Sequence, residues 1–238
     1  MNSIHAKLCL TALITFLLAN FASAQSGETD SRLHADGPQG WGVREAQVKN
    51  PNLPRVLLIG DSILNGYLPT VVRELDGKAN IDAWVNPYHQ ASDGLHEKLR
   101  DILASHNYAV IHFKMGLHGW PKGRIPDGQF IPLTRKLVET LRTNSPNARL
   151  IWASSTPVTI KCHPTALDPA INPIIINHNA MAAQVMTDAK IPVNDLYTLM
   201  VNRLDLARGD QFHWKPEGSI IQGKAVAASI AGQFKTTP

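Results

Sequence analysis

One stretch near the start of the chain constrains the fold most strongly: an apolar run that ends in Gly60-Asp61-Ser62. The run covers residues 55–59 and is rich in aliphatic and β-branched side chains, which predicts a strand buried on both faces, as in a parallel sheet. Asp61 or Ser62 is a good N-cap for the helical pattern that follows. We therefore expect Ser62 at the carboxyl end of a central strand, where open α/β sheets bind their ligands.

The same turn has a plainer explanation. A strand, a sharp turn at Gly60 and a helix capped by Ser62 can form an ordinary corner of an α/β fold. A serine hydroxyl at a helix start does have one chemical advantage, because the helix dipole favours negative charge that develops beside it. A catalytic role for Ser62 therefore depends on a base elsewhere in the chain.

The first 24 residues have the organisation of a secretory signal peptide. Lys7 precedes an apolar segment from Leu8 to Phe21, and Ala22-Ser23-Ala24 forms a small-residue cleavage site. The apolar segment is too short and wrongly flanked for a membrane-spanning helix. We expect an exported protein, periplasmic or extracellular, that has no membrane span.

Composition limits the classes of partner and cofactor. The chain has 23 Lys and Arg against 19 Asp and Glu, a net charge of +4 without a basic run, so nucleic acid is not an expected partner. Cys162 is the one cysteine outside the leader, which excludes an internal disulfide. The histidines lack the i, i+4 spacing of a helical zinc site, so we expect no metal and no other cofactor. Nothing in the composition predicts the oligomeric state.

Strand and helix patterns alternate from about residue 53 onward. Strands are predicted at about 55–59, 81–85, 108–113, 150–153 and 191–195, and helices at about 65–76, 93–104, 130–144, 173–189 and 216–231. The alternation predicts a three-layer α/β/α sandwich around a mostly parallel, flavodoxin-like sheet of five strands. Residues 53–238 form the predicted domain. Residues 25–52 are polar and aperiodic, and we expect a tail or wrapping segment, with Trp41 and Val43 as possible anchors.

A motif near the end of the chain supplies the groups that a nucleophilic serine needs. Asp210 and His213 are three residues apart, just before the last predicted helix. One turn can then hold the carboxylate against one ring nitrogen while the other nitrogen faces Ser62, as serine hydrolysis requires. Asp195 is a rival orienting acid that would have to reach His213 from farther along the chain. A thiol nucleophile at Cys162, beside His163, is less favoured because no activating group is visible.

The order of these motifs resembles the GDSL/SGNH hydrolase superfamily. The resemblance rests on Gly60-Asp61-Ser62, on Gly116-Leu117-His118-Gly119 after the third strand, and on Asp210-Gln211-Phe212-His213 followed by Gly218, and it spans residues 55–231. It implies that Ser62 is the nucleophile, His213 the base and Asp210 the acid. It also implies an oxyanion hole made by the Ser62 N–H, a glycine N–H after the second strand and an asparagine side chain after the third.

Two positions depart from the family pattern. His118 stands where the asparagine is usual; a neutral imidazole can donate one hydrogen bond there, or His118 can simply pack away from the site. In the loop 86–94 no glycine occupies the expected place and Pro87 cannot donate, so we take Gly94, with Ser92 as the alternative. Gly116 and Asp61 are further candidates for substrate contact, although Asp61 can equally serve to hydrogen-bond the turn.

The resemblance implies a serine esterase that works through an acyl-enzyme on a small-molecule or polysaccharide ester. Exported bacterial members are often deacetylases of polysaccharides or glycosides, so an O-acetylated carbohydrate is the first candidate substrate. Four aromatic residues could stack on sugar rings, although core packing explains each equally well: Trp120, Trp214, Phe130 and Tyr88. A lipase or thioesterase is less favoured, because the predicted loops are polar rather than a long apolar lid. A non-catalytic glycan-binding or cell-envelope protein on the same fold is the alternative from another class.

Overall fold

A mixed six-stranded sheet forms the centre of the molecule. A computed structural model describes residues 40–234, so the predicted leader and most of the predicted tail lie outside the described residues. The strand order is β1-β3-β2-β4-β5-β8. The strands are β1 Gly42–Arg44, β2 Arg55–Gly60, β3 Asn80–Val85, β4 Val110–Phe113, β5 Arg149–Ala153 and β8 Val193–Asn194. The last five run parallel in the order 2-1-3-4-5, which is the flavodoxin-like order.

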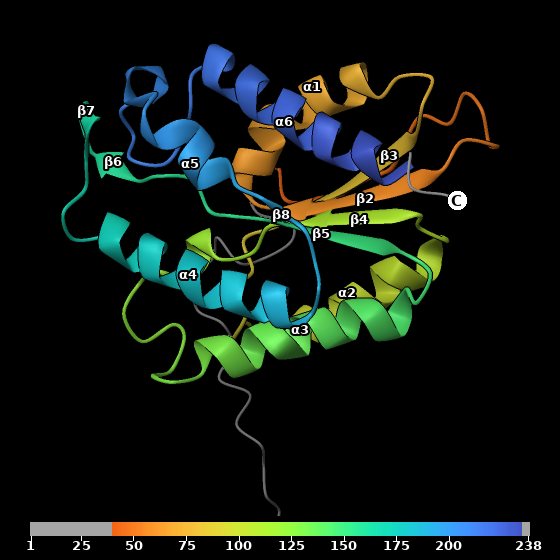
Figure 1. Cartoon of the computed structure of the whole chain (residues 1–238), viewed down its shortest axis with the longest axis horizontal. Coiled ribbons are helices and arrows are strands. Elements are labelled where there is room, and N and C mark those ends of the chain that lie inside the picture. The colour runs from red at the N-terminus through yellow and green to blue at the C-terminus, as the bar shows by residue number, and fades with distance from the viewer. Residues whose placement is uncertain (1–39, 235–238) are drawn as a thin grey trace, which may run out of the picture.

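Helices cover both faces of this sheet, so the predicted three-layer α/β/α fold is confirmed (Figure 1). One layer contains α1 (Ser62–Glu74), α5 (Leu196–Val201) and α6 (Pro216–Phe234). The other contains α2 (Leu95–Ser105), α3 (Phe130–Asn144) and α4 (Asn172–Asp188). Because each parallel strand returns through a helix, the loops that follow the strands gather at one edge of the sheet.

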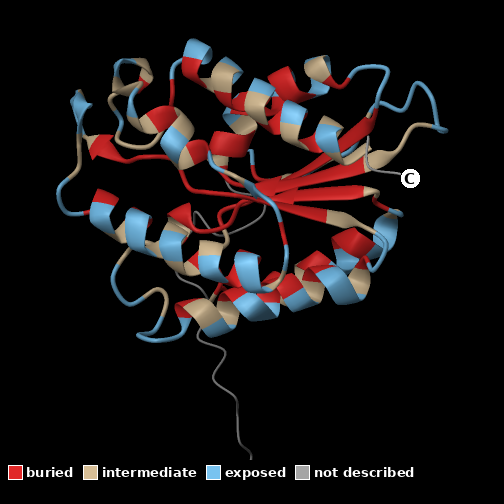
Figure 2. Cartoon of the chain, in the orientation of Figure 1, coloured by how far each residue is buried: buried red, intermediate tan, exposed pale blue. Residues whose placement is uncertain are grey.

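The core lies on both faces of β2, as its continuous apolar sequence predicts. Val56 and Leu58 pack into the cluster under α1 and α6, whereas Leu57 and Ile59 pack into the cluster under α2, α3 and α4. The alternation follows the two-residue period of a strand. Figure 2 shows the result: the four central strands, β2 to β5, are buried along nearly their whole length, and the helices expose one side.

The prediction of five strands is wrong by one, because part of the expected tail forms a strand. β1 pairs antiparallel with β3, from Gly42 opposite Val85 to Arg44 opposite Ala83. Trp41 is buried beside this strand at 7% exposure, but Val43, the other proposed anchor, points outward at 43% exposure. The segment is too short to show a periodic pattern, and its pairing depends on a strand about forty residues away.

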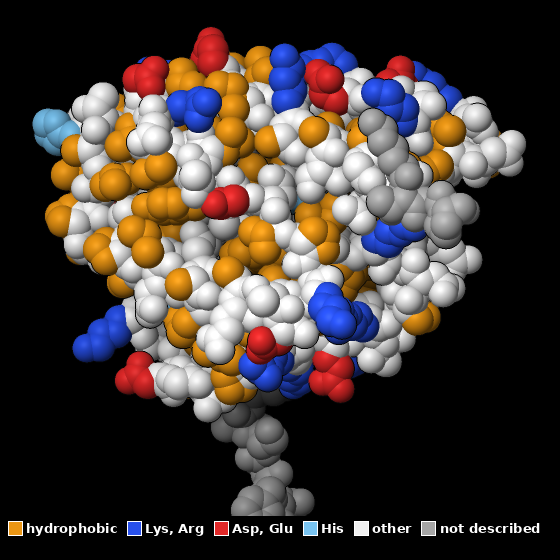
Figure 3. Space-filling model, viewed as in Figure 1, with side chains coloured by type: hydrophobic (Ala, Val, Ile, Leu, Met, Phe, Trp, Pro, Cys, Tyr) orange, Lys and Arg blue, Asp and Glu red, His pale blue; other side chains and the backbone are white. Residues whose placement is uncertain are grey.

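A hairpin of two short strands and a short helix were also not expected. The predicted loop 158–171 contains a hairpin of β6 (Thr159–Ile160) and β7 (His163–Leu167), and α5 follows β8 directly. The hairpin lies at the same end of the sheet as the first turn of α4 (Figure 1). Hydrophobic side chains gather on this side of the face seen in Figure 3, while acidic and basic side chains are interspersed elsewhere. Within residues 40–234, no helix is long and apolar enough to cross a membrane.

Candidate active site

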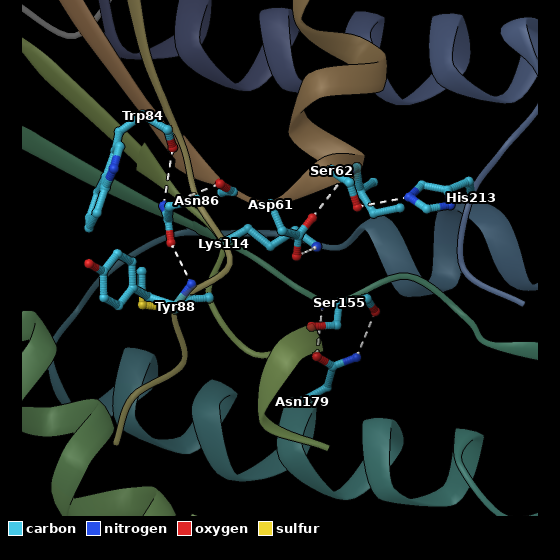
Figure 4. A network of polar contacts seen from close by, with 12 residues as sticks. Asp61, Ser62, Trp84, Asn86, Tyr88, Lys114, Ser155, Asn179 and His213 are labelled. Carbon is cyan, nitrogen blue, oxygen red and sulfur yellow. Dashed lines mark hydrogen bonds and ion pairs between the residues drawn. The ribbon is translucent and has the colours of Figure 1, made fainter. Parts of the chain in front are cut away.

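The turn between β2 and α1 presents Ser62 as the first residue of the helix. Asp61 is the N-cap, and its carboxylate accepts a hydrogen bond of 2.9 Å from the Ile63 N–H. A side chain at position 60 would bring its Cβ within 3.0 Å of the Leu64 Cβ, so glycine lets α1 approach the strand closely. The Gly60 carbonyl accepts hydrogen bonds from both the backbone and the side-chain amide of Asn86, which fixes the end of β2 (Figure 4).

Ser62, His213 and Asp210 form a continuous hydrogen-bonded chain. The Ser62 Oγ lies 2.8 Å from His213 Nε2, and His213 Nδ1 lies 3.0 Å from Asp210 Oδ2. Figure 4 shows His213 reaching Ser62 from the loop that precedes α6. This geometry allows the imidazole to take the hydroxyl proton while the carboxylate fixes its tautomer.

The loop itself holds the carboxylate of Asp210 in place. Asp210 Oδ1 accepts the N–H groups of Phe212 at 3.2 Å and His213 at 2.9 Å, so one turn supplies both acid and base. Partial burial alone would raise the pKa of Asp210, but the hydrogen bond from the His213 N–H and the His213 charge outweigh it and lower the pKa. Asp210 is therefore ionised at neutral pH.

A buried ion pair lies directly behind the nucleophile. Lys114 Nζ, on a side chain with 0% exposure, donates to Asp61 Oδ2 at 2.7 Å. Burial favours the neutral carboxyl, but the Lys114 charge and then the His118 charge outweigh burial and hold the pKa of Asp61 below its usual value. Asp61 is thus fully engaged by Lys114 and the helix N-terminus, which favours its role in the turn over substrate contact.

The Gly116-Leu117-His118-Gly119 segment forms a 3₁₀ turn, η2 (Leu117–Gly119), after β4. The His118 ring meets Trp41 edge-on, with centroids 5.8 Å apart, and the His118 carbonyl accepts a 3.0 Å hydrogen bond from Arg124. A Cβ at position 116 would lie 3.1 Å from the Ser155 Oγ. Trp41 and Arg124 thus fix the position of His118, whose charge acts on Asp61. The role of His118 as an oxyanion donor stays a prediction.

A side-chain clamp fixes the next loop along the sheet edge. Asn179 of α4 accepts the Ser155 N–H and donates to the Ser155 carbonyl, both at 2.9 Å (Figure 4). Ser155 faces Gly116, so the clamp also limits where η2 can move. The clamp joins residues 24 apart, and no local pattern predicted it.

The other predicted site residues lie in different environments. Gly94 is the exposed N-cap of α2, in a left-handed conformation with φ of 71°. Trp214 is 5% exposed and packs in the core, which favours the core-packing explanation for this residue. Trp120 is partly exposed and stacks on Phe212, with centroids 6.4 Å apart. Of the two tryptophans, Trp120 is the more exposed.

The rival groups have other partners. Asp195 caps α5 through the Thr198 N–H at 3.1 Å and accepts the Ser154 hydroxyl at 2.8 Å, so it orients a helix rather than His213. Cys162 is exposed in the turn of the β6–β7 hairpin, with φ of 67°. Among the described residues, no group of three or more His, Cys, Asp and Glu side chains could hold a metal ion.

Lys114 is the main site residue that motif reasoning missed. It follows the apolar strand β4 and precedes the buried Met115. A single lysine between buried apolar residues is a usable signal, because a charge in that position requires a partner. The identity of the partner could not be read locally, since Asp61 lies 53 residues earlier.

Known proteins resemble this chain in structure but not in sequence. No protein-family model matches the sequence, and no curated protein matches it. Among solved structures, a carbohydrate esterase family 3 protein from Talaromyces cellulolyticus has a TM-score of 0.64 at 14% identity, over 78% of this chain and 100% of that chain. A carbohydrate acetylesterase family member from Sinorhizobium meliloti has a TM-score of 0.60 at 16% identity, over 76% and 99%.

A protein proposed to be an SGNH hydrolase, from Slackia heliotrinireducens, has a TM-score of 0.58 at 15% identity, over 75% of this chain and 100% of that chain. At sequence identities this low, structural similarity establishes the fold and not the substrate. The chain has the fold of the SGNH hydrolases and carbohydrate esterases.

Proposed function

We propose that this protein is an exported serine esterase that hydrolyses carboxylic esters through an acyl-enzyme, with O-acetylated carbohydrate as its substrate. The hydrogen-bonded chain from Ser62 through His213 to Asp210 is the observation that supports catalysis most strongly. The esterases among the proteins of similar fold support an ester as the substrate. A non-catalytic glycan-binding protein would not need these three side chains in contact.

In the proposed reaction the Ser62 Oγ attacks the ester carbonyl, and its proton passes to His213 Nε2. The tetrahedral oxyanion accepts a hydrogen bond from the Ser62 N–H, which lies at the positive end of α1, and we assign a second donor to His118. His213 then gives its proton to the departing alcohol, which leaves the acyl group on Ser62. Water attacks this ester with His213 again as the base, and Ser62 is regenerated.

The export part of the proposal rests on the sequence of residues 1–24. A leader with a short apolar segment and an Ala22-Ser23-Ala24 cleavage site should be removed after Ala24. N-terminal sequencing of the protein from its native host should then begin at Gln25 in a soluble exported fraction. Protein that retains Met1 in the cytosol would contradict export without affecting the catalytic assignment.

The catalytic assignment is tested by burst kinetics with p-nitrophenyl acetate. Wild-type protein should release about one equivalent of nitrophenol per active site rapidly, followed by slower turnover, because the acyl-enzyme accumulates. Ser62→Ala should remove the burst and the labelling by a fluorophosphonate, with an unchanged circular dichroism spectrum. Labelling that persists in Ser62→Ala, or that maps to another residue, would contradict the assignment.

A further inference from the structure

A cavity of about 460 Å³ lies between the long loop after η2 and the first half of α4. Its volume falls in the range of small-molecule binding sites, roughly 300–1,000 Å³. The loop wall is formed by residues 119–131, and the helix wall by side chains between Ile174 and Met181. Nothing in the proposed catalytic steps uses this cavity.

The cavity is connected to the candidate active site through both of its walls. The loop wall continues from η2, and Arg124 ties it back to the His118 carbonyl with a 3.0 Å hydrogen bond. Trp120, which lines the cavity, also stacks on Phe212, the residue before His213. The helix wall is held by Asn179, whose amide clamps Ser155 next to Gly116. A ligand in the cavity would therefore contact a segment that packs against the catalytic loop, through the stacking of Trp120 on Phe212.

The walls combine apolar surface with a few polar groups. Trp120 and Phe130 lie on the loop side, and Ile174 and Met181 on the helix side. The polar groups include the amide of Asn177 and the imidazole of His178, which stacks on Phe130 with centroids 4.3 Å apart. Partial burial lowers the pKa of His178, so its ring is neutral near pH 7 and offers both a donor and an acceptor.

This combination suits a sugar better than a lipid or an anion. A pyranose ring has apolar C–H faces that pack on aromatic side chains, and hydroxyl edges that need donors and acceptors together. The charged side chains in the lining are one lysine, Lys122, and one aspartate, Asp127, so the cavity has no excess of positive charge to select a uronate. A fatty acyl chain would leave Asn177 and His178 facing hydrocarbon, which is costly.

We propose that this cavity is an alcohol subsite that binds neutral sugar residues of a glycan whose acetyl ester lies at Ser62. Its part in hydrolysis rests on the proposed function, but sugar binding can be measured without hydrolysis. The subsite would set substrate preference by holding the alcohol side of the ester. Trp120 is the shared wall between the subsite and the catalytic loop.

Binding is tested with Ser62→Ala protein and three neutral oligosaccharides: xylotetraose, cellotetraose and N-acetylated chitotetraose. Calorimetry or NMR titration should detect binding of at least one, with chemical shifts of Trp120 and His178 perturbed. Met181→Trp, which fills the cavity from α4, should weaken that binding at least tenfold. The matched control is Ile176→Trp, because Ile176 lies on the same helix, is 48% exposed and does not line this cavity.

Hydrolysis gives a second readout. Met181→Trp should lower kcat/KM for an acetylated oligosaccharide at least tenfold more than for p-nitrophenyl acetate, mainly through KM. Absence of binding by all three sugars, or equal effects of Met181→Trp and Ile176→Trp, would overturn the subsite. A wild-type protein that binds a sugar in this cavity but gives no acyl-enzyme burst would overturn the proposed function and leave the subsite standing.

Discussion

Two aspartates support Ser62, Asp61 from the neighbouring position and Asp210 through His213, and their environments are opposite. Asp61 is buried at 3% exposure and pairs with the fully buried Lys114, whereas the side chain of Asp210 is 42% exposed and is held by backbone N–H groups. A buried carboxylate needs an opposite charge to offset its lost hydration, while an exposed one needs orientation alone. We infer that Asp61 belongs to the scaffold and that Asp210 acts in the chemistry, so their loss should affect different measurements.

The sharpest test of this difference is Asp210→Asn. An amide can keep the turn but favours the wrong imidazole tautomer, so kcat for p-nitrophenyl acetate should fall by roughly 10³–10⁴-fold. The free energy of unfolding should change by less than about 1 kcal/mol, because the side chain is 42% exposed and the amide oxygen of asparagine can still accept the backbone N–H groups. Denaturant titration beside the kinetics separates the two. A loss of activity below tenfold would mean that Asp210 does not orient His213.

Lys114→Met tests the scaffold side. Removal of the ammonium leaves Asp61 buried without its cation, which should cost roughly 3–5 kcal/mol of unfolding free energy. The double variant with Asp61→Asn should recover a large part of that loss, since no charge is then left unpaired. Arg135→Met is a suitable control, because its pair with Asp188 joins side chains that are 55% and 52% exposed and should contribute about 1 kcal/mol or less. Equal losses in the single and double variants would show that the unpaired charge of Asp61 is not the cause of the loss.

His118 bears on both regions, because its charge acts on the Asp61 carboxylate and we assign its ring to the oxyanion formed at Ser62. If it donates to the oxyanion, His118→Ala should lower kcat by roughly 10²–10³-fold, with a much smaller change in KM. His118→Asn should keep most of the activity because an amide can donate from a similar position. Nearly full activity in His118→Ala would make this residue a bystander, and equal damage in both variants would require a role that an amide cannot perform.

Acid stability separates these two carboxylates from a buried histidine. His112 on β4 is fully buried, burial lowers its pKa to about 3, and its Nε2 lies 3.2 Å from the Asn194 amide. In the unfolded chain His112 binds a proton below about pH 6.5, whereas in the folded chain it stays neutral down to about pH 3. The stability that neutral His112 contributes is therefore lost as the pH falls from about 6.5 toward 3. Asp61 and Asp210, with lowered pKa values, lose their contributions only below about pH 4.

Urea titrations at pH 7 and pH 5 should therefore differ by about 2 kcal/mol in unfolding free energy, at about 1.4 kcal/mol per pH unit. His112→Leu should reduce this difference, while Asp61→Asn and Asp210→Asn should leave it intact. If His112→Leu keeps the full difference in unfolding free energy between pH 7 and pH 5, the difference comes from other histidines.

The parts of the molecule that the sequence predicted are those with local signals. The helix at 130–144 has the predicted bounds, and Ser62, His213 and Asp210 lie in hydrogen-bond contact as their motifs indicated. The missed parts depend on distant partners. β1 has three residues whose pairing is specified by β3, and the Lys114–Asp61 pair joins segments that are far apart in the chain. Only the assembled sheet brings such groups together.

The short strand β1 has a consequence for any attempt to trim the protein. A chain that begins at residue 53, where the regular alternation starts, would lose the Trp41 ring against His118 and the Ala46 N–H that binds Asp82 at 2.7 Å. It would also uncover the buried edge of β3 from Ala83 to Val85, with which β1 pairs. Such an edge pairs readily with another chain, so the trimmed protein should self-associate and precipitate. The three residues of β1 thus cover a strand edge through which two copies of the protein could otherwise pair.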